Sequence, residues 1–220
     1  MGGKQRLYKT KVTEVKQIAA NVYLLSFKRA FNFKAGQIIA LDVEQDGIPR
    51  MYSIAGGEKD EIIDILFDEK PDAKLTPQLS ALKPGDTIYV SEPFGNFQCS
   101  DDEAWRIASG TGVAPFVSMT RSGKAKGKIL IHGGRFDETF YFSEVLERFF
   151  TPENYIRCAS RQEDTTYFSG CLTTWLREQN KCPLNAKYYL CGSPEMVVEV
   201  RDLLISEGIA SKNIVSETYF

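Results

Sequence analysis

The sequence predicts two domains, an antiparallel β-barrel over residues 1–98 followed by an α/β domain with a parallel sheet over residues 99–220. Short runs of β-branched and aromatic residues between turns fill the first hundred positions, which is typical of a barrel or sandwich. Apolar strands then alternate with helical patterns, which predicts a parallel sheet with helices on both faces. A chain of 220 residues has room for one large domain or two small ones.

Turn residues bound the strands expected in the first half. Asp46-Gly47 marks one turn, and the run Lys-Pro-Gly-Asp at 83–86 marks another. One short helix fits near Thr76–Leu82, with Thr76 as its N-cap and Pro77 at its first helical position. The expected strands are Tyr8–Val15, Val22–Phe27, Gln37–Val43, Arg50–Ile54, Ile62–Phe67 and Thr87–Val90.

The second half is expected to alternate strand and helix to its end, after a join at residues 91–102. The expected strands are Trp105–Ala108, Lys128–His132, Tyr155–Ala159, Tyr188–Cys191 and Asn213–Ser216. The expected helices are Pro115–Arg121, Glu138–Phe150, Leu172–Gln179 and Glu195–Glu207. Ligands of such sheets bind beyond the carboxyl ends of the strands, so the segments that follow strands hold the candidate binding residues.

Composition excludes several classes of protein. With 43% hydrophobic and 25% charged residues, the chain is an ordinary globular protein. No apolar run approaches the roughly 18 residues of a membrane span, and no apolar leader precedes the first strand. Five cysteines without a C-x-x-C pair and a single histidine, His132, argue against a disulfide framework and a metal site. We therefore expect a cytoplasmic protein with no metal, no membrane and no nucleic-acid partner; its oligomeric state stays open.

Basic residues are concentrated at the start of the chain. Residues 1–30 hold seven lysines and arginines against one acid, Glu14, although the whole chain has a net charge of -2. Such a basic face can steer an acidic partner. Lysines also protect exposed strand edges, and both interpretations stay open.

Two motifs of the first half suit a phosphate joined to a flat ring. Residues 50–53 read R-M-Y-S, and strand alternation places Arg50 and Tyr52 on one face. Arginine can clamp a phosphate with two hydrogen bonds, tyrosine can stack on a heterocycle, and Ser53 can donate to a ring nitrogen. The helix that begins near Thr76 offers backbone N–H groups to an anion. Together the strand and the helix could share one pyrophosphate.

Two further motifs lie between a strand and a helix in the second half. Residues 108–116 read A-S-G-T-G-V-A-P-F, where Gly110 and Gly112 permit a tight turn and close approach of a phosphate. Pro115 stands where the last glycine of G-x-G-x-x-G would be. Residues 191–196 read C-G-S-P-E-M, in which Ser-Pro caps the following helix and a small residue lets a ring approach the backbone.

These four motifs, in this order and spacing, resemble the ferredoxin–NADP reductase family, above all its bacterial ferredoxin/flavodoxin–NADP reductases. The similarity runs from about residue 8 to Phe220. It implies a FAD-binding barrel, an NADP-binding α/β domain and an acidic electron carrier, ferredoxin or flavodoxin, as partner. Hydride would pass between NADP(H) and FAD, and single electrons between FAD and the carrier. The alternatives are an NAD(P)H-dependent flavin reductase, the reductase component of an oxygenase, or a non-enzymatic nucleotide-sensing module.

The resemblance also implies a role for each motif residue. Arg50 would contact the FAD phosphates, Tyr52 would stack on the isoalloxazine, and Ser53 would bond near the flavin N5. The catalytic candidates are Ser53, Cys191 and Glu217. The other cofactor-binding candidates are Met51, Leu66, Lys74, Leu75, Thr76, Gly110, Thr111, Gly112, Cys191, Gly192, Tyr219 and Phe220. Of these, Lys74–Thr76 would cradle the pyrophosphate, Cys191 and Gly192 would border the nicotinamide, and the last two residues would cover the isoalloxazine or the adenine.

The 2′-phosphate of NADP requires positive charge, and three residues that follow strands are similar to the family's phosphate-binding positions: Arg135, Ser160 and Arg161. An arginine fork suits a phosphate better than lysine does. The sequence departs from the family at Cys171, where another arginine is common, and at Ala73, where glycine is usual. The first departure weakens the prediction of NADP over NAD.

Overall fold

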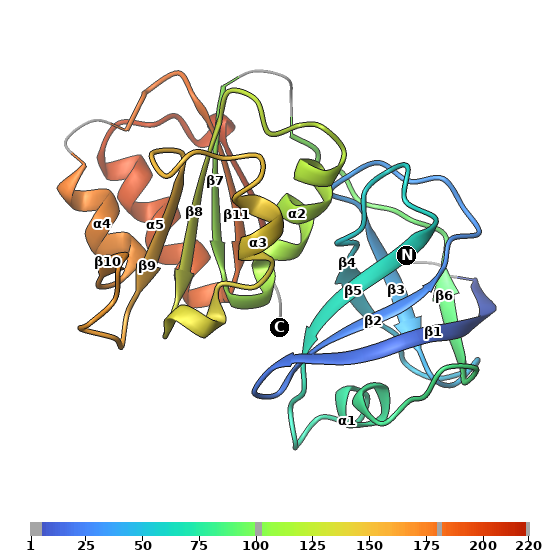
Figure 1. Ribbon diagram of the computed structural model, residues 1–220. Coiled ribbons are helices and arrows are strands. Elements are labelled where there is room, and N and C mark those ends of the chain that lie inside the picture. The colour runs from blue at the N-terminus through green and yellow to red at the C-terminus, as the bar shows by residue number, and fades with distance from the viewer. Residues whose placement is uncertain (1–5, 100–102, 180–181, 219–220) are drawn as a thin grey trace. The chain divides into compact units, whose positions relative to one another are not determined.

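The computed structural model describes residues 6–99, 103–179 and 182–218, and the chain divides into two compact units, residues 1–98 and 99–220 (Figure 1). Within the described residues, no helix is long and apolar enough to cross a membrane.

The first unit is a closed antiparallel barrel of six strands in the order β4-β3-β6-β1-β2-β5. The strands are β1 (Leu7–Ala19), β2 (Val22–Lys28), β3 (Ile38–Asp42), β4 (Arg50–Ser53), β5 (Ile62–Asp68) and β6 (Thr87–Ser91). The outer strands meet at a bridge between Ile54 and Ile65, which closes the sheet on itself. The predicted barrel is therefore confirmed.

Strand β1 is longer than the sequence predicts, because it continues to Ala19. Its first part pairs with β6 and its second part with β2, and the register shifts between Val12 and Glu14 and again after Gln17. Such irregularities bend a strand and increase its twist, so β1 can pair with a different neighbour along each part.

Helix α1 (Thr76–Ser80) adds Leu75 and Leu79 to the barrel core. The N-cap predicted at Thr76 is wrong: Leu75 is the N-cap, and Pro77 is the second helical residue instead of the first. The Thr76 hydroxyl oxygen accepts a hydrogen bond from the backbone N–H of Lys70 at 2.9 Å. The hydroxyl therefore fixes the loop that precedes α1 and leaves the helix N-terminus uncapped.

The second unit is a six-stranded parallel sheet in the order β10-β9-β8-β7-β11-β12. Its strands are β7 (Ala104–Ser109), β8 (Lys128–Gly134), β9 (Tyr155–Ala159), β10 (Phe168–Ser169), β11 (Lys187–Gly192) and β12 (Ile214–Thr218). Its helices are α2 (Ala114–Arg121), α3 (Ser143–Leu146), α4 (Leu172–Glu178) and α5 (Pro194–Ser206), with 3₁₀ turns η1 (Gly110–Val113), η2 (Asp137–Thr139) and η3 (Ser211–Asn213).

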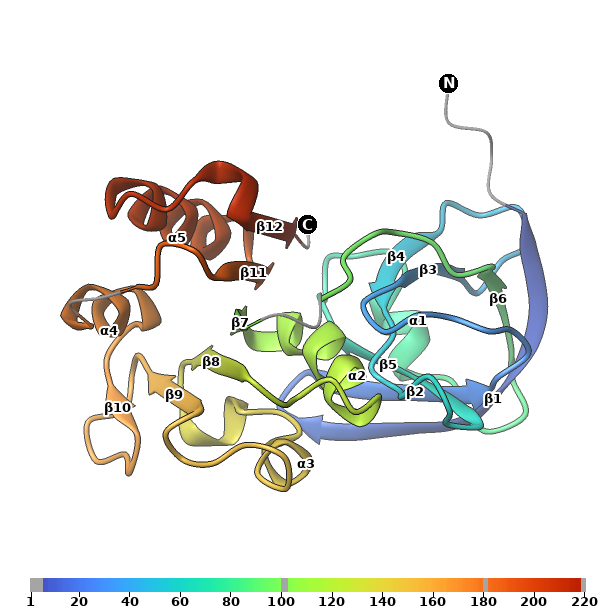
Figure 2. The same cartoon turned by 90° about the horizontal axis from the view of Figure 1, so that it is seen from above.

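Helices α2 and α3 lie on one face of this sheet and α4 and α5 on the other (Figure 2). The face toward α4 and α5 is apolar, with Ile107, Ile131 and Leu190 fully buried. The strand order reverses between β7 and β11, and ligands of doubly wound sheets bind at this kind of switch point. The predicted parallel sheet with helices on both faces is confirmed.

The single helix predicted over Glu138–Phe150 is wrong. This segment holds the turn η2 and the short helix α3, separated by Phe142 in the left-handed region at φ 61°. Phe140 and Tyr141 are buried, and the Phe140 ring packs edge-on against His132 with centroids 5.3 Å apart. These aromatic side chains pack into the sheet, so tertiary contacts override the helical pattern.

Candidate functional site

Strand β4 presents the R-M-Y-S motif at the edge where the barrel closes. Arg50 and Met51 are exposed, Tyr52 is half-buried, and Ser53 is 2% exposed. The Tyr52 ring meets Phe67 of β5 edge-on at 6.4 Å. Burial raises the pKa of Tyr52 to about 12, which the Arg50 charge opposes and the Asp42 charge reinforces. Tyr52 is therefore a neutral ring near a cation at neutral pH.

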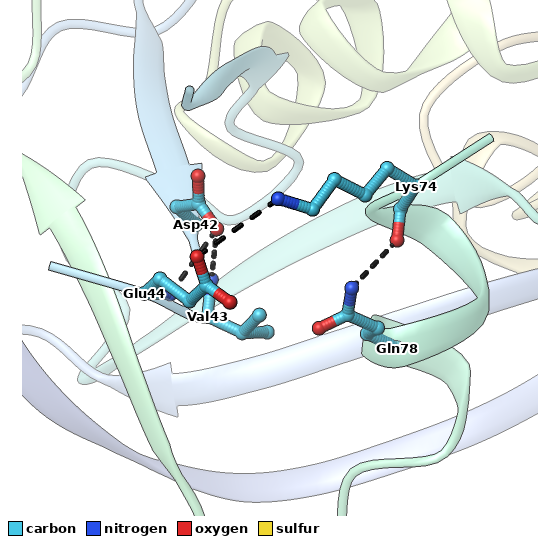
Figure 3. Close-up of polar contacts among 5 residues, drawn as sticks. All are labelled: Asp42, Val43, Glu44, Lys74 and Gln78. Atoms are coloured by element: carbon cyan, nitrogen blue, oxygen red, sulfur yellow. Dashed lines mark hydrogen bonds and ion pairs between the residues drawn. The ribbon is translucent and has the colours of Figure 1, made fainter. Parts of the chain in front are cut away.

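Two cations border the loop between β3 and β4. Arg50 starts β4 opposite Leu41, and Lys74 Nζ reaches across to Glu44 Oε2 at 4.0 Å (Figure 3). The side chains of Lys74 and Glu44 are 82% and 61% exposed, so this ion pair is weak. Among the described residues Arg50 has no ion-pair partner.

The backbone around these cations is held by side chains. Asp42 Oδ1 accepts from the N–H groups of Val43 at 2.7 Å and Glu44 at 3.1 Å. Gln78 Nε2 donates to the Lys74 carbonyl at 2.8 Å, as Figure 3 shows. Ala73 is not among the described residues with positive φ, so alanine fits where the family usually has glycine.

The first unit thus holds two exposed cations that border one loop, a half-buried aromatic ring and a buried hydroxyl, which are the kinds of group that a flavin dinucleotide requires. Leu66 and Leu75 are buried, so they offer a ligand their backbone and not their side chains. Thr76 is partly exposed, but its hydroxyl already bonds Lys70. The structure therefore brings Arg50 and Lys74 to one loop, and Tyr52 and Ser53 continue the same strand.

In the second unit, the turns after β7 and β11 touch through their backbones. A Cβ on Gly112 would lie 2.5 Å from the carbonyl carbon of Cys191 and 2.5 Å from the Cα of Gly192. Gly192 in turn has φ 148°, and a Cβ there would overlap the Ser109 hydroxyl. Only glycines permit this contact, which packs the two turns closely together at the switch point of the sheet.

Two of the three predicted catalytic residues, Cys191 and Glu217, lie opposite each other on neighbouring strands of the sheet. Cys191 pairs in register with Ala108 of β7 and with Glu217 of β12. Cys191 is fully buried and Glu217 is partly exposed. Thr111, partly exposed, lies in η1 next to Gly110. The two aromatic candidates, Tyr219 and Phe220, lie outside the described residues.

Sequence reasoning missed Ser109, which joins the two turns. Its hydroxyl oxygen accepts from the backbone N–H of Ser193 at 3.2 Å, and the Ser193 hydroxyl caps α5 by accepting from Met196 N–H at 3.3 Å. The Ser-Pro cap predicted for this helix is confirmed. The only sequence signal for Ser109 is its place directly before G-T-G.

Arg135 and Arg161 lie side by side at the ends of β8 and β9. The Arg161 N–H donates to the Arg135 carbonyl at 2.9 Å, and the Ser160 N–H and hydroxyl both donate to the Gly134 carbonyl. Both guanidinium groups are exposed, and within the described ranges neither has an ion-pair partner. Two free arginines and a serine at adjacent strand ends suit a phosphate monoester.

Cys171 borders the same strand end. The Gly170 N–H donates to the Ala159 carbonyl at 3.0 Å, so the chain at Gly170 runs beside the end of β9, where Ser160 follows. Cys171 is the next residue after Gly170. Cys171 is exposed and stands before the first residue of α4.

A buried polar cluster lies on the α2 and α3 face of the sheet. His132 is fully buried, and its Nδ1 lies 3.2 Å from the Tyr155 hydroxyl oxygen. Arg157 lies between the Tyr155 and Tyr167 rings, 4.7 and 3.8 Å from their centroids, and pairs with Glu147. Burial lowers the pKa of His132 to about 3; the Gly110 carbonyl opposes this shift and the Arg157 charge adds to it. His132 is therefore neutral at pH 7.

The His132 pKa predicts a loss of stability in acid. The unfolded chain takes up a proton on His132 below about pH 6.5 and the folded chain does not, so this group disfavours folding as pH falls. Between pH 7 and 4.5 we expect the free energy of unfolding to fall by about 2–3 kcal/mol relative to His132→Asn, which cannot titrate. Urea unfolding of both proteins measures this difference, and a gap that does not change with pH would contradict it. Both proteins keep Tyr155 and Arg157, which act on the ring, and Glu147, which pairs with Arg157.

Comparisons with known proteins follow the division of the chain. Residues 9–99 match the family described as oxidoreductase FAD-binding domain, and residues 107–202 match the oxidoreductase NAD-binding domain. The chain is 29% identical to ferredoxin–NADP reductase of Pseudomonas aeruginosa, over 86% of each chain. It is 28% identical to flavodoxin/ferredoxin–NADP reductase of Escherichia coli, over 85% of each.

Other kinds of electron-transfer protein are similar as well. The toluate 1,2-dioxygenase electron transfer component of Pseudomonas putida is 26% identical over 96% of this chain and 67% of that protein. Among solved structures, ferredoxin NADP+ reductase of Neisseria gonorrhoeae with bound FAD and NADP superposes with a TM-score of 0.88. That comparison covers 99% of this chain and 100% of the other at 21% identity, so it supports the fold alone.

Proposed function

We propose, from the premise that the chain belongs to the ferredoxin–NADP reductase family of flavin-dependent oxidoreductases, that it transfers hydride between NADP(H) and FAD. Single electrons would pass between FAD and a ferredoxin or flavodoxin. The observation that carries the choice of NADP over NAD is the free arginine pair, Arg135 and Arg161, held together at neighbouring strand ends.

FAD, when bound, supplies the chemistry that links a two-electron donor to a one-electron carrier. Arg50 and Lys74 bind its phosphates, with the Lys74 side chain leaving Glu44 to do so. Tyr52 gives the flavin a neutral aromatic face, since an ionised tyrosinate would disfavour electron-rich flavin. Ser53, buried at the end of β4, holds a proton donor at the reactive edge.

The second unit holds the nicotinamide dinucleotide by backbone and by charge. Gly112 and Gly192 let the turns after β7 and β11 pack backbone to backbone, and the nicotinamide ring would lie against the outer side of these turns at the switch point. Thr111, Cys191 and Glu217 border that position. Arg135, Ser160 and Arg161 bind the 2′-phosphate, which NADP carries and NAD lacks.

Steady-state reduction of carriers tests this function. With NADPH as donor, a ferredoxin or flavodoxin should be reduced with a higher kcat/KM than free flavin, and NADH should be a poorer donor. Equal use of NADH, with no advantage for a small acidic protein, would favour a reductase component of an oxygenase. That second function is supported by the similarity to the Pseudomonas putida electron transfer component over 96% of the chain.

Gly112→Ala tests the backbone contact at the switch point. The new Cβ would meet the Cys191 carbonyl group, which is backbone and cannot yield as a flexible side chain can. We expect the rate of flavin reduction by NADPH to fall about 100-fold, roughly 3 kcal/mol, with FAD content unchanged. Gly123→Ala is the control, because its Cβ meets nothing within 4 Å. Gly123→Ala should lower only the stability of the folded protein, because Gly123 has a φ of 80°, a conformation that alanine adopts at a cost. Equal rates for the two variants would contradict the contact.

Cys171→Arg should strengthen the preference for NADPH. The side chain starts beside the strand end that carries Ser160 and Arg161, where a third guanidinium adds a charge-assisted hydrogen bond to a phosphate. We expect KM for NADPH to fall about threefold to tenfold and KM for NADH to stay constant. Cys171→Ser is the control that keeps a small polar side chain. A parallel change in both KM values would show that this position does not contact the 2′-phosphate.

A further inference from the structure

The buried His132 ring lies next to the turn that the proposed function assigns to the nicotinamide dinucleotide. His132 pairs in register with Ala108 on β7, and Gly110 starts η1 two residues later. The Gly110 carbonyl is close enough to raise the pKa of His132 against the effect of burial. Gly110 itself has φ 53°, so its peptide adopts a conformation that other residues avoid.

Only one nitrogen of this ring has a hydrogen-bond partner. Nδ1 lies 3.2 Å from the Tyr155 hydroxyl oxygen. Nε2 is buried, and among the described residues no atom forms a hydrogen bond with it. The Gly110 carbonyl raises the His132 pKa as a nearby hydrogen-bond acceptor does, but it makes no hydrogen bond of normal geometry with Nε2. A buried polar atom without a partner is costly, and native structures hold few of them.

The surroundings decide which nitrogen carries the proton. A neutral imidazole has one N–H and one acceptor nitrogen. With the proton on Nδ1, Nε2 would be a lone pair facing a carbonyl oxygen, and the two would repel. With the proton on Nε2, the Tyr155 hydroxyl donates to Nδ1 and the N–H faces the Gly110 carbonyl. The second arrangement satisfies both ends of the ring.

We propose that His132 is a positioning residue for dinucleotide binding, whose Nε2–H bonds the Gly110 carbonyl when a nucleotide closes the G-T-G turn, with Tyr155 fixing the tautomer. This inference rests on the proposed function, which places the nucleotide at that turn. Completing a bond to an orphaned buried donor should tighten nucleotide binding about tenfold. A histidine that only fills the core would show no response to the nucleotide.

The single histidine of the chain makes this inference directly measurable. The FAD-loaded chain labelled with ¹⁵N-histidine gives one imidazole in its NMR spectrum, besides any purification tag. Before nucleotide is added, we expect a neutral ring with the proton on Nε2. Saturating NADP+ should shift the Nε2–H proton downfield and slow its exchange with water. The readout is independent of turnover.

Two pairs of variants separate positioning from packing. His132→Gln keeps an N–H near the position of Nε2 and should retain NADP+ affinity within about threefold, whereas His132→Leu should lose about tenfold. Tyr155→Phe keeps the ring and removes the hydroxyl, so it should produce a mixture of tautomers and an intermediate affinity. Hydrogen exchange at the Gly110–Val113 amides, compared with and without NADP+, shows whether the turn closes in each variant.

A proton on Nδ1, or an Nε2 signal that stays fixed while NADP+ binds, would overturn the inference and leave the proposed function intact. If the wild-type chain binds neither NADP+ nor NAD+, the proposed function fails, and this inference fails with it. Equal loss of affinity in His132→Gln and His132→Leu would also count against positioning, because both variants change the packing while only the first keeps a donor.

Discussion

Replacing Arg135 and Arg161 together with alanine should lower kcat/KM for NADPH at least 100-fold and leave kcat/KM for NADH within about threefold. Each guanidinium gives a phosphate a charge-assisted hydrogen bond worth about 1.5–3 kcal/mol, and two such bonds correspond to a factor of roughly 10² to 10⁴. Steady-state kinetics with both donors and one artificial acceptor measure the change.

Arg201→Ala is the matched control, because Arg201 is an exposed arginine of the same unit that bonds Asp202 on α5. It should leave both donors unaffected. An equal fall in kcat/KM for NADPH and NADH in the double variant would show that the arginine pair does not read the 2′-phosphate.

The second large effect is expected at the barrel. Arg50→Ala should weaken FAD binding about 10- to 100-fold, because the proposed phosphate site loses an arginine fork and keeps only the point charge of Lys74. Arg50→Lys should give an intermediate loss, since an ammonium group cannot form the fork. Flavin fluorescence, which rises as FAD leaves the protein, measures the dissociation constant.

Lys28→Ala removes another exposed cation of the barrel, at the end of β2, and serves as its control. It should bind FAD as the wild type does. Normal affinity in Arg50→Ala would place the FAD phosphates elsewhere, and Lys74 would then be the first candidate to test.

Much of the fold is predictable because strand periodicity and turn residues are local signals. The strands at Arg50 and at Tyr188 were predicted within a few residues, since apolar runs bounded by turns mark them. The end of β1 was not, because its bend depends on pairing with two different strands. The break at Phe142 was missed for a similar reason: it arises from rings that pack on His132 and Tyr167.

The candidate site likewise contains residues that the sequence indicates and residues that it does not. Motif residues such as Gly112 and Arg161 stand out in the sequence because glycine turns and cations after strands have a direct chemical meaning. Ser109, 84 positions before its partner Ser193, has no such signal, and its role is visible only in the folded sheet. The Tyr155–His132 pair likewise joins two strands, so neither residue alone indicates a buried polar cluster beside the G-T-G turn.

Anaerobic titration of the purified, FAD-loaded chain with NADPH and with NADH tests the central claim most directly. The predicted result is loss of the yellow flavin absorbance with one equivalent of NADPH per FAD, and much slower loss with NADH. A flavin that stays oxidised with both donors, or a chain that holds no flavin at all, would contradict it.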